Sequence, residues 1–206
     1  MLDVYFEKHM DHAKVIKDRY LYIDQPERID FIYSMDGIPD DEKGDYQGAS
    51  NRVLKQFLTR LNRYPVFVTF GEVFSDDEVE PFFQKNNLSY TKFQPNKRPY
   101  YSVQVNHARE LELLPEETYW YGAQNDFYFL SFKNLLTFES RIVRRWFFKR
   151  EMIVPVVNTT EEMLFIRIEH DFMGYYLFSN EACFDTEDKA KTFLPEGDGI
   201  EYYEYE

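Results

Sequence analysis

Apolar residues recur along the chain at the spacings typical of helices and of strands. The clearest helical pattern covers residues 49–64. Its apolar positions are Val53, Leu54, Phe57, Leu58 and Leu61. Ser50 is a candidate N-cap, and Pro65 is expected to stop this helix.

Short runs of β-forming residues predict strands around this helix. Residues 19–23 and 28–33 are expected to form a hairpin, because residues 24–27 have the composition of a turn. The continuous apolar run 66–70 predicts a strand buried on both faces. Further strands are predicted over residues 100–105, 127–132, 152–157, 163–169 and 175–178. The segment 35–48, rich in glycine and acids, predicts an exposed loop.

Two shorter helices and a terminal strand complete the prediction. A capping-box spacing over 75–78 announces a helix toward residue 86, which Pro81 either kinks or forces to start late. Residues 185–188 begin a short helix that ends before Pro195. The tail 200–206 alternates β-formers with acids and predicts an edge strand.

Strands outnumber helices in this pattern, which predicts an α+β fold. We expect a mixed, mainly antiparallel sheet with two or three packed amphipathic helices, one of which covers the sheet with Val53, Phe57 and Leu61. The 206 residues suit a single α+β domain, 1–206, and two small halves meeting near 107–125 are the alternative.

Composition and charge narrow the class of protein. The 24 basic and 37 acidic residues give a net charge of −13, and 19% of residues are aromatic. So many aromatic residues argue against disorder, and a single cysteine excludes a disulfide framework or a cysteine-based zinc site. Without a secretory signal or a long apolar run, the sequence predicts a soluble cytoplasmic protein with no membrane association.

Patterns typical of catalysis are sparse. The sequence has no nucleophile elbow, phosphate-binding loop or dinucleotide fingerprint, so no cofactor is predicted. Cys183 has no histidine nearby and is interpreted as a buried structural thiol. The sequence therefore favours a protein that is not an enzyme. The alternative is a hydrolase assembled from distant residues, with His107 or His170 as the base.

The remaining histidines do not define a metal site. His9 and His12 are three residues apart and on a helix would share one face, with Asp11 nearby. Two imidazoles are too few ligands for a dedicated site, so we predict no bound metal. The dipeptide His170-Asp171 could form an acid–base pair, but the favoured interpretation is a pair of surface residues without a catalytic role.

The segment 141–150 combines five bases with aromatic residues and contains no acid. Such a pattern can stack on nucleobases and neutralise phosphates, which makes Arg144 and Arg145 candidates for an anionic ligand. A net charge of −13 repels phosphates, so direct nucleic-acid binding is not favoured. The favoured interpretation places the segment over the core, with Ile142, Val143, Trp146 and Phe147 buried.

Acidic residues are clustered in two segments, 72–80 and 196–206, with five acids each. Acids interleaved with tyrosines can cover a basic cleft with both charge and aromatic anchors. The candidate contact residues are Asp76, Asp77, Glu78, Glu201, Tyr203, Glu204 and Glu206. A merely solvated acidic surface that aids solubility is the alternative.

The order of features also resembles a group of small, uncharacterised bacterial cytosolic proteins that includes immunity partners of polymorphic toxins. The resemblance lies in residues 29–31 before the helix 49–64, and in 163–169 running through 170–174 to a strand and a helix. Where relatives have an Arg-Gly pair after the aspartate, this chain has Phe172-Met173, and no functional residue is carried over.

Charge, clustered acids and abundant aromatics together predict a function. We expect a non-enzymatic acidic binding protein, an inhibitor or immunity-type partner of a basic protein such as a nuclease toxin. An uncharacterised hydrolase, or a nucleic-acid-associated protein that uses the segment 141–150, is the alternative.

Overall fold

The computed structural model describes residues 2–16, 21–39, 45–71, 78–95, 99–125, 127–145, 148–168, 174–196 and 200–203. The strands of its large sheet are β1 (Leu2–Lys8), β3 (Phe31–Pro39), β4 (Val66–Gly71), β5 (Ser89–Phe93), β6 (Tyr100–Val105), β7 (Tyr128–Ser131), β10 (Leu164–Ile168), β11 (Tyr175–Ser179) and β12 (Ile200–Tyr203). These nine strands have the order β12-β1-β3-β11-β10-β7-β4-β6-β5. Neighbouring strands are antiparallel except β12 and β1, which are parallel.

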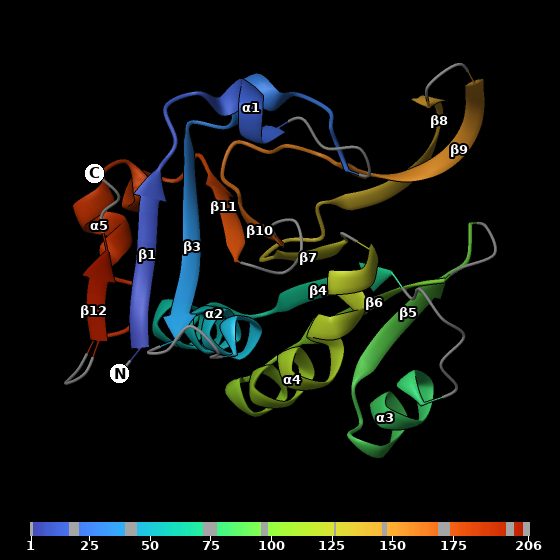
Figure 1. The fold of residues 1–206 in the computed structure, drawn as a ribbon. Helices are drawn as coiled ribbons and strands as arrows, with labels where there is room; N and C mark the ends of the chain where they lie inside the picture. Colours follow the sequence, from blue (N-terminus) through green and yellow to red (C-terminus); the bar gives the residue numbers. More distant parts are fainter. Residues whose placement is uncertain are drawn as a thin grey trace.

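A small sheet and several helices flank the large sheet (Figure 1). The small sheet contains β2 (Tyr22–Ile23), β9 (Phe148–Val157) and β8 (Leu136–Arg145), in that order. The helices are α1 (His12–Ile16), α2 (Tyr46–Leu61), α3 (Val79–Lys85), α4 (Ala108–Asn125) and α5 (Glu187–Lys191). The predicted α+β fold with a mainly antiparallel sheet is confirmed. Among the described residues, no helix is both long and apolar enough to cross a membrane.

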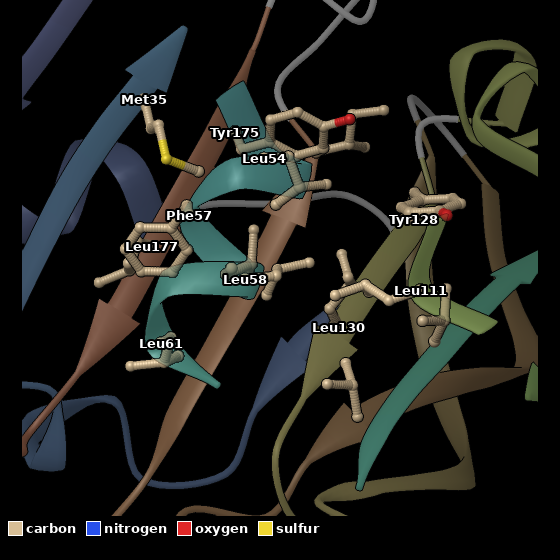
Figure 2. Close-up of a cluster of buried hydrophobic side chains, with 14 of the residues drawn as sticks. Met35, Leu54, Phe57, Leu58, Leu61, Leu111, Tyr128, Leu130, Tyr175 and Leu177 are labelled. Atoms are coloured by element: carbon tan, nitrogen blue, oxygen red, sulfur yellow. The ribbon is translucent and has the colours of Figure 1, made fainter. Parts of the chain in front are cut away.

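Helix α2 packs on one face of the large sheet, as its apolar spacing predicts. Val53, Phe57 and Leu61 are all buried. The Phe57 ring lies 6.4 Å from Phe184 and 6.2 Å from Phe193, measured between ring centroids. Figure 2 shows this face of α2 pointing toward side chains of the neighbouring strands. We call this face of the sheet the helix face and the opposite one the outer face.

The start of α2 differs from the prediction. The helix begins one turn before Ser50, and its N-cap is Asp45, whose side chain accepts a hydrogen bond from the Gly48 backbone N–H at 2.8 Å. Ser50 is buried instead, and its hydroxyl accepts a hydrogen bond from the Gly37 N–H at 3.0 Å. The predicted loop 35–48 is wrong at both described ends, because β3 continues to Pro39 and α2 starts at Tyr46.

The predicted hairpin over residues 19–33 is also wrong. In the described part of this segment β2 has two residues and pairs with β9, while β3 pairs with β1 and β11. The local β propensity is real, but each strand finds its partner far away in the sequence. Strand β7 likewise pairs with both β4 and β10, so strands from before and after residues 107–125 share one sheet. Residues 108–125 themselves form α4.

A second hydrophobic core lies on the outer face, over the middle of the sheet. It is built around Phe129, Phe165 and Phe178, whose rings stack in series at 5.4 and 4.7 Å between centroids. Val15 of α1 and Val157 at the end of β9 cover these rings. The outer face therefore carries a packed centre, with β1 and β3 toward one end of the sheet and β4, β6 and β5 toward the other.

Candidate functional site

Acidic side chains gather on the outer face at the β12 end of the sheet. Alternate residues of β1 are buried in the helix-face core, so Asp3, Tyr5 and Glu7 belong to the outer face. The register of β1 and β3 places Asp36 directly beside Tyr5. The Tyr5 hydroxyl donates a hydrogen bond to the Glu7 carboxylate. We call Asp3, Tyr5, Glu7 and Asp36 the acid–tyrosine face.

The C-terminal strand adds predicted contact residues to this end of the sheet. Strand β12 pairs with β1 as an edge strand, in agreement with the prediction, and the register sets Glu201 beside Asp3 and Tyr203 beside Tyr5. Glu204 and Glu206 lie outside the described residues. The structure thus joins acids from the two ends of the chain, of which only the C-terminal ones were candidates in the sequence.

The acid–tyrosine face concentrates negative charge. The Asp3 Oδ1 atom is buried and has no hydrogen-bond donor among the described residues. Asp3 and Glu201 occupy adjacent cross-strand positions, an arrangement that is unfavourable for like charges. Gly174 leaves room for the Asp36 carboxylate, because a Cβ there would lie 1.3 Å from Asp36 Oδ1. Such a face is suited to accept hydrogen bonds from cationic groups of another molecule.

The other predicted acidic cluster, residues 72–80, offers fewer described acids to a binding partner. Asp76 and Asp77 lie outside the described residues, and Glu78 is exposed immediately before α3. The next acid, Glu80, is occupied within the fold. It accepts hydrogen bonds from Lys92 Nζ at 2.5 Å and from the hydroxyls of Tyr90 and Tyr101 at 3.0 and 3.2 Å. Glu80 therefore braces α3 against β5 and β6.

This brace predicts a pH-dependent contribution to stability. The hydrogen bonds from Lys92 and Tyr90 hold the pKa of Glu80 below its usual value. A lowered folded pKa stabilises the protein above the unfolded value, and this stabilisation is lost as the pH falls through the folded pKa. We expect Glu80→Gln to cost less than about 1 kcal/mol near neutral pH, since the pair is partly exposed. Urea unfolding should show the difference vanishing in acid, and Glu162→Gln, at an exposed acid, is the control.

The basic segment forms a projecting hairpin, which we call the β8–β9 ribbon. Arg144 lies opposite Lys149, and Arg145 lies opposite Phe148. The ribbon extends away from the rest of the molecule (Figure 1). Strand β2 pairs with β9 only at Val156 and Val157.

The expected burial of this segment over the core is wrong at Ile142, which is 68% exposed. Only the base of the β8–β9 ribbon packs on the outer face of the large sheet, so the outer part of β8 projects into solvent. Arg141, Lys149 and Arg150 are exposed as well, and Arg141 forms an ion pair with Glu139 at 2.7 Å. Trp146 and Phe147, which were expected to be buried, lie outside the described residues.

A groove of about 360 Å³ lies between the base of the ribbon and the outer face of β4, β5 and β6. Its polar lining residues are Thr69, Ser89, Thr91, Ser102, Gln104 and Asn134, and the others are Phe67, Tyr90, Phe93, Tyr100, Leu136 and Phe138. Among the described residues, the lining contains no aspartate, glutamate, lysine, arginine, histidine or cysteine. The described lining therefore carries no formal charge, within a protein of net charge −13.

Aromatic rings form one wall of this groove. The Phe138 ring lies 4.4 Å from the Phe93 ring and 5.0 Å from the Tyr100 ring, measured between centroids. Burial raises the pKa of the Tyr100 hydroxyl, which keeps it neutral. On the floor, the Thr69 hydroxyl donates to the Ser102 hydroxyl at 3.0 Å. The groove combines flat apolar surfaces with neutral hydrogen-bonding groups.

Sequence reasoning missed this groove, although part of its signal is visible. The run 100–105 alternates in burial, with Tyr101, Val103 and Val105 in the helix-face core and the residues between them facing the groove. That alternation is readable from the sequence. Strand β5 and the base of β8 were not predicted, so the opposite wall could not be anticipated.

The described histidines do not form a catalytic arrangement. His9 Nε2 lies 2.5 Å from Ser34 Oγ, the distance of a Ser–His pair. Ser34 is only 4% exposed, however, and it sits in the middle of β3 with Glu7 and Tyr176 beside it on both neighbouring strands. Its hydroxyl is not presented to a substrate. The expected shared helical face of His9 and His12 is wrong, because α1 begins at His12.

The other residues considered for catalysis are His107, His170 and Cys183. His107 is exposed and lies 3.4 Å from Glu110, and His170 lies outside the described residues. Burial, followed by the neighbouring Glu181, raises the pKa of the Cys183 thiol and so keeps it protonated. Within the described ranges, no three or more His, Cys, Asp and Glu side chains are grouped so that they could hold a metal ion.

Comparison of the chain with protein-family models, with curated proteins and with solved structures finds no match.

Proposed function

We propose that the protein is a non-enzymatic acidic binding protein, an inhibitor or immunity-type partner that binds a basic protein through its acid–tyrosine face. The observation that carries this proposal is the joining of β12 to β1. It sets Glu201 beside Asp3 and Tyr203 beside Tyr5, next to Glu7 and Asp36. Acids and tyrosines from three strands thereby share one end of the sheet.

The physical chemistry of this face supports a cationic partner. The register places Asp3 and Glu201 at neighbouring positions of two paired strands, so a lysine or arginine of the partner at this end of the sheet would offset the unfavourable placement of two like charges. Tyrosines are effective anchors because they bury a large area while their hydroxyls remain bonded. The net charge of −13 would steer a basic partner toward the protein and accelerate association at low salt.

The test begins with capture of the partner from the native host and its identification by mass spectrometry. The association rate is then measured by surface plasmon resonance at low and at physiological salt. Reversing three charges with Glu201→Lys, Glu204→Lys and Glu206→Lys changes the net charge from −13 to −7. We expect the association rate to fall about tenfold or more at low salt, with a shallower salt dependence.

A matched variant distinguishes an effect of the substituted positions on the association rate from an effect of the net charge. Glu112→Lys, Glu117→Lys and Glu162→Lys change three exposed acids away from β12 and give the same net charge of −7. This variant should retain most of the wild-type association rate. Equal losses in the two variants would show that only the total charge matters, and an unchanged rate in the first variant would remove the C-terminal strand from the interface.

A further inference from the structure

The uncharged groove and the basic ribbon are continuous through one strand. Phe138 of β8 lies in the aromatic wall of the groove, and Arg144, an even number of positions further along the same strand, occupies a position on the same face. Arg144 lies six positions after Phe138, about 20 Å along an extended strand. A ligand that lies in the groove can therefore continue along the ribbon toward its basic end.

The groove suits a flat, neutral ligand with hydrogen-bonding edges. The rings of Phe93, Tyr100 and Phe138 supply stacking surfaces. Neutral hydroxyl and amide groups of the floor can donate and accept without demanding a charge on the ligand. A nucleobase has these properties, and stacking on aromatic side chains is how unpaired bases are bound without strong sequence preference.

The ribbon provides positive charge beside this groove. Residues 139–151 contain five bases and two acids, so their net charge is 5 − 2 = +3, and the rest of the chain carries −16. Lys149 is exposed and lies opposite Arg144 in the hairpin register, so these two bases occupy positions on the face of Phe138, together with Glu151. Arg141 and Arg150 occupy positions on the opposite face of the ribbon. From these two neighbouring features we infer that the groove and the ribbon together bind single-stranded nucleic acid, with bases in the groove and phosphates along the ribbon.

The overall negative charge does not oppose this site, because the fold separates the charges. The acid–tyrosine face belongs to β1 and β3, which are seven and six inter-strand spacings from β5 in the nine-stranded sheet. At about 4.8 Å per spacing, this face is about 29–34 Å from β5. The Debye length at physiological salt is about 8 Å, so repulsion from that face is largely screened at the ribbon.

A single strand fits this surface better than a duplex. The groove is open on a sheet face and can receive a base only when that base is unstacked and unpaired. The inference uses the end of the sheet opposite to the acid–tyrosine face, and it does not depend on the proposed protein partner.

The test measures binding of fluorescein-labelled ten-nucleotide oligo(dT) and oligo(rU) by fluorescence anisotropy, over a series of salt concentrations. Arg144→Ala with Lys149→Ala should weaken binding about tenfold and make the salt dependence shallower, because two phosphate contacts are lost. Phe93→Leu should weaken binding about fivefold or more with an unchanged salt slope, and Phe93→Tyr should retain binding because it keeps the ring. Phe93 is 36% exposed, so these substitutions spare the core.

Control variants separate binding at this site from a general effect of charge and from self-association. Arg52→Ala with Arg109→Ala removes the same charge from exposed positions of α2 and α4, and it should leave affinity unchanged. Circular dichroism verifies folding of each variant. The inference is overturned if no oligonucleotide binds at low salt, if a duplex of equal length binds as tightly, or if the Arg52 and Arg109 variant loses as much affinity. Salt-sensitive self-association in sedimentation, without oligonucleotide binding, would instead assign the ribbon to the acidic surface of a second copy.

Discussion

Replacing Gly37 with alanine is expected to destabilise the protein by about 3 kcal/mol or more. Strand β3 crosses directly beneath the first turns of α2 at this glycine. A Cβ on Gly37 would lie 2.3 Å from the carbonyl carbon of Ala49 and 2.6 Å from the backbone nitrogen of Ser50. Because these are backbone atoms of a helix, they cannot rotate away, and the helix must move as a whole.

The same displacement breaks local hydrogen bonds. The Ser50 hydroxyl accepts from the Gly37 N–H at 3.0 Å and donates to the Gly37 carbonyl at 3.3 Å. Both bonds are buried, so their loss adds to the steric cost. Urea unfolding followed by circular dichroism measures the change in the free energy of unfolding.

Gly48→Ala is the matched control for this prediction. Its Cβ would also make a close approach, 2.2 Å from Asp45 Oδ2, but that atom is the end of a flexible side chain. Weakening of the Asp45 cap costs about 1 kcal/mol, and alanine regains about 1 kcal/mol of helix propensity, so the net change should stay within about 1 kcal/mol. A Gly37→Ala variant as stable as Gly48→Ala would show that α2 slides freely on β3.

Replacing Phe57 with alanine is the second substitution with a large expected effect, about 3–5 kcal/mol in the free energy of unfolding. Phe57 of α2 is 0% exposed in the helix-face core, where its ring packs near the rings of Phe184 and Phe193. Its removal leaves a cavity that helices and strands on all sides cannot close without moving.

Two further variants keep this prediction testable if Phe57→Ala does not fold. Phe57→Leu fills most of the space and should show a smaller loss. Gln56→Ala changes the exposed neighbour on the same helix and should alter stability by less than about 0.5 kcal/mol. Chemical denaturation of the three proteins under one condition gives the comparison. Similar stabilities for Phe57→Ala and Gln56→Ala would contradict the packing described for α2.

Local patterns in the sequence predicted the helices and strands that are determined mainly by residues close together in the chain. The apolar spacing of α2 identified the face that is buried, and the β-rich runs that became β4 and β6 were found within a residue of their observed bounds. Pro81 predicts a helix that is kinked or starts late, and α3 begins at Val79. Each of these features depends on residues that are only a few positions apart in the sequence.

Elements with weak or conflicting local signals were missed. Helix α4 contains Pro115 in its interior, which local rules treat as a break. Strand β5 is largely exposed and mixes polar with aromatic residues, so it lacks an apolar run. Strand β8 contains Ile142 and Val143, apolar residues that favour a segment lying over the core, yet Ile142 is exposed.

By itself the sequence determined the fold class, the main helix and its buried face, and the excess of acidic and aromatic residues, because periodicity and composition are properties of the local chain. The tertiary structure alone decided which strands pair. Pairing between β12 and β1 brings Glu201 next to Asp3, and packing of the ribbon base over β6 creates the groove at Phe138 and Tyr100. The acid–tyrosine face at the β12 end of the large sheet and the bases of the ribbon in the separate small sheet are kept apart by this strand pairing. Such long-range pairings are selected by burial summed over the whole sheet, and no short window of sequence carries that information.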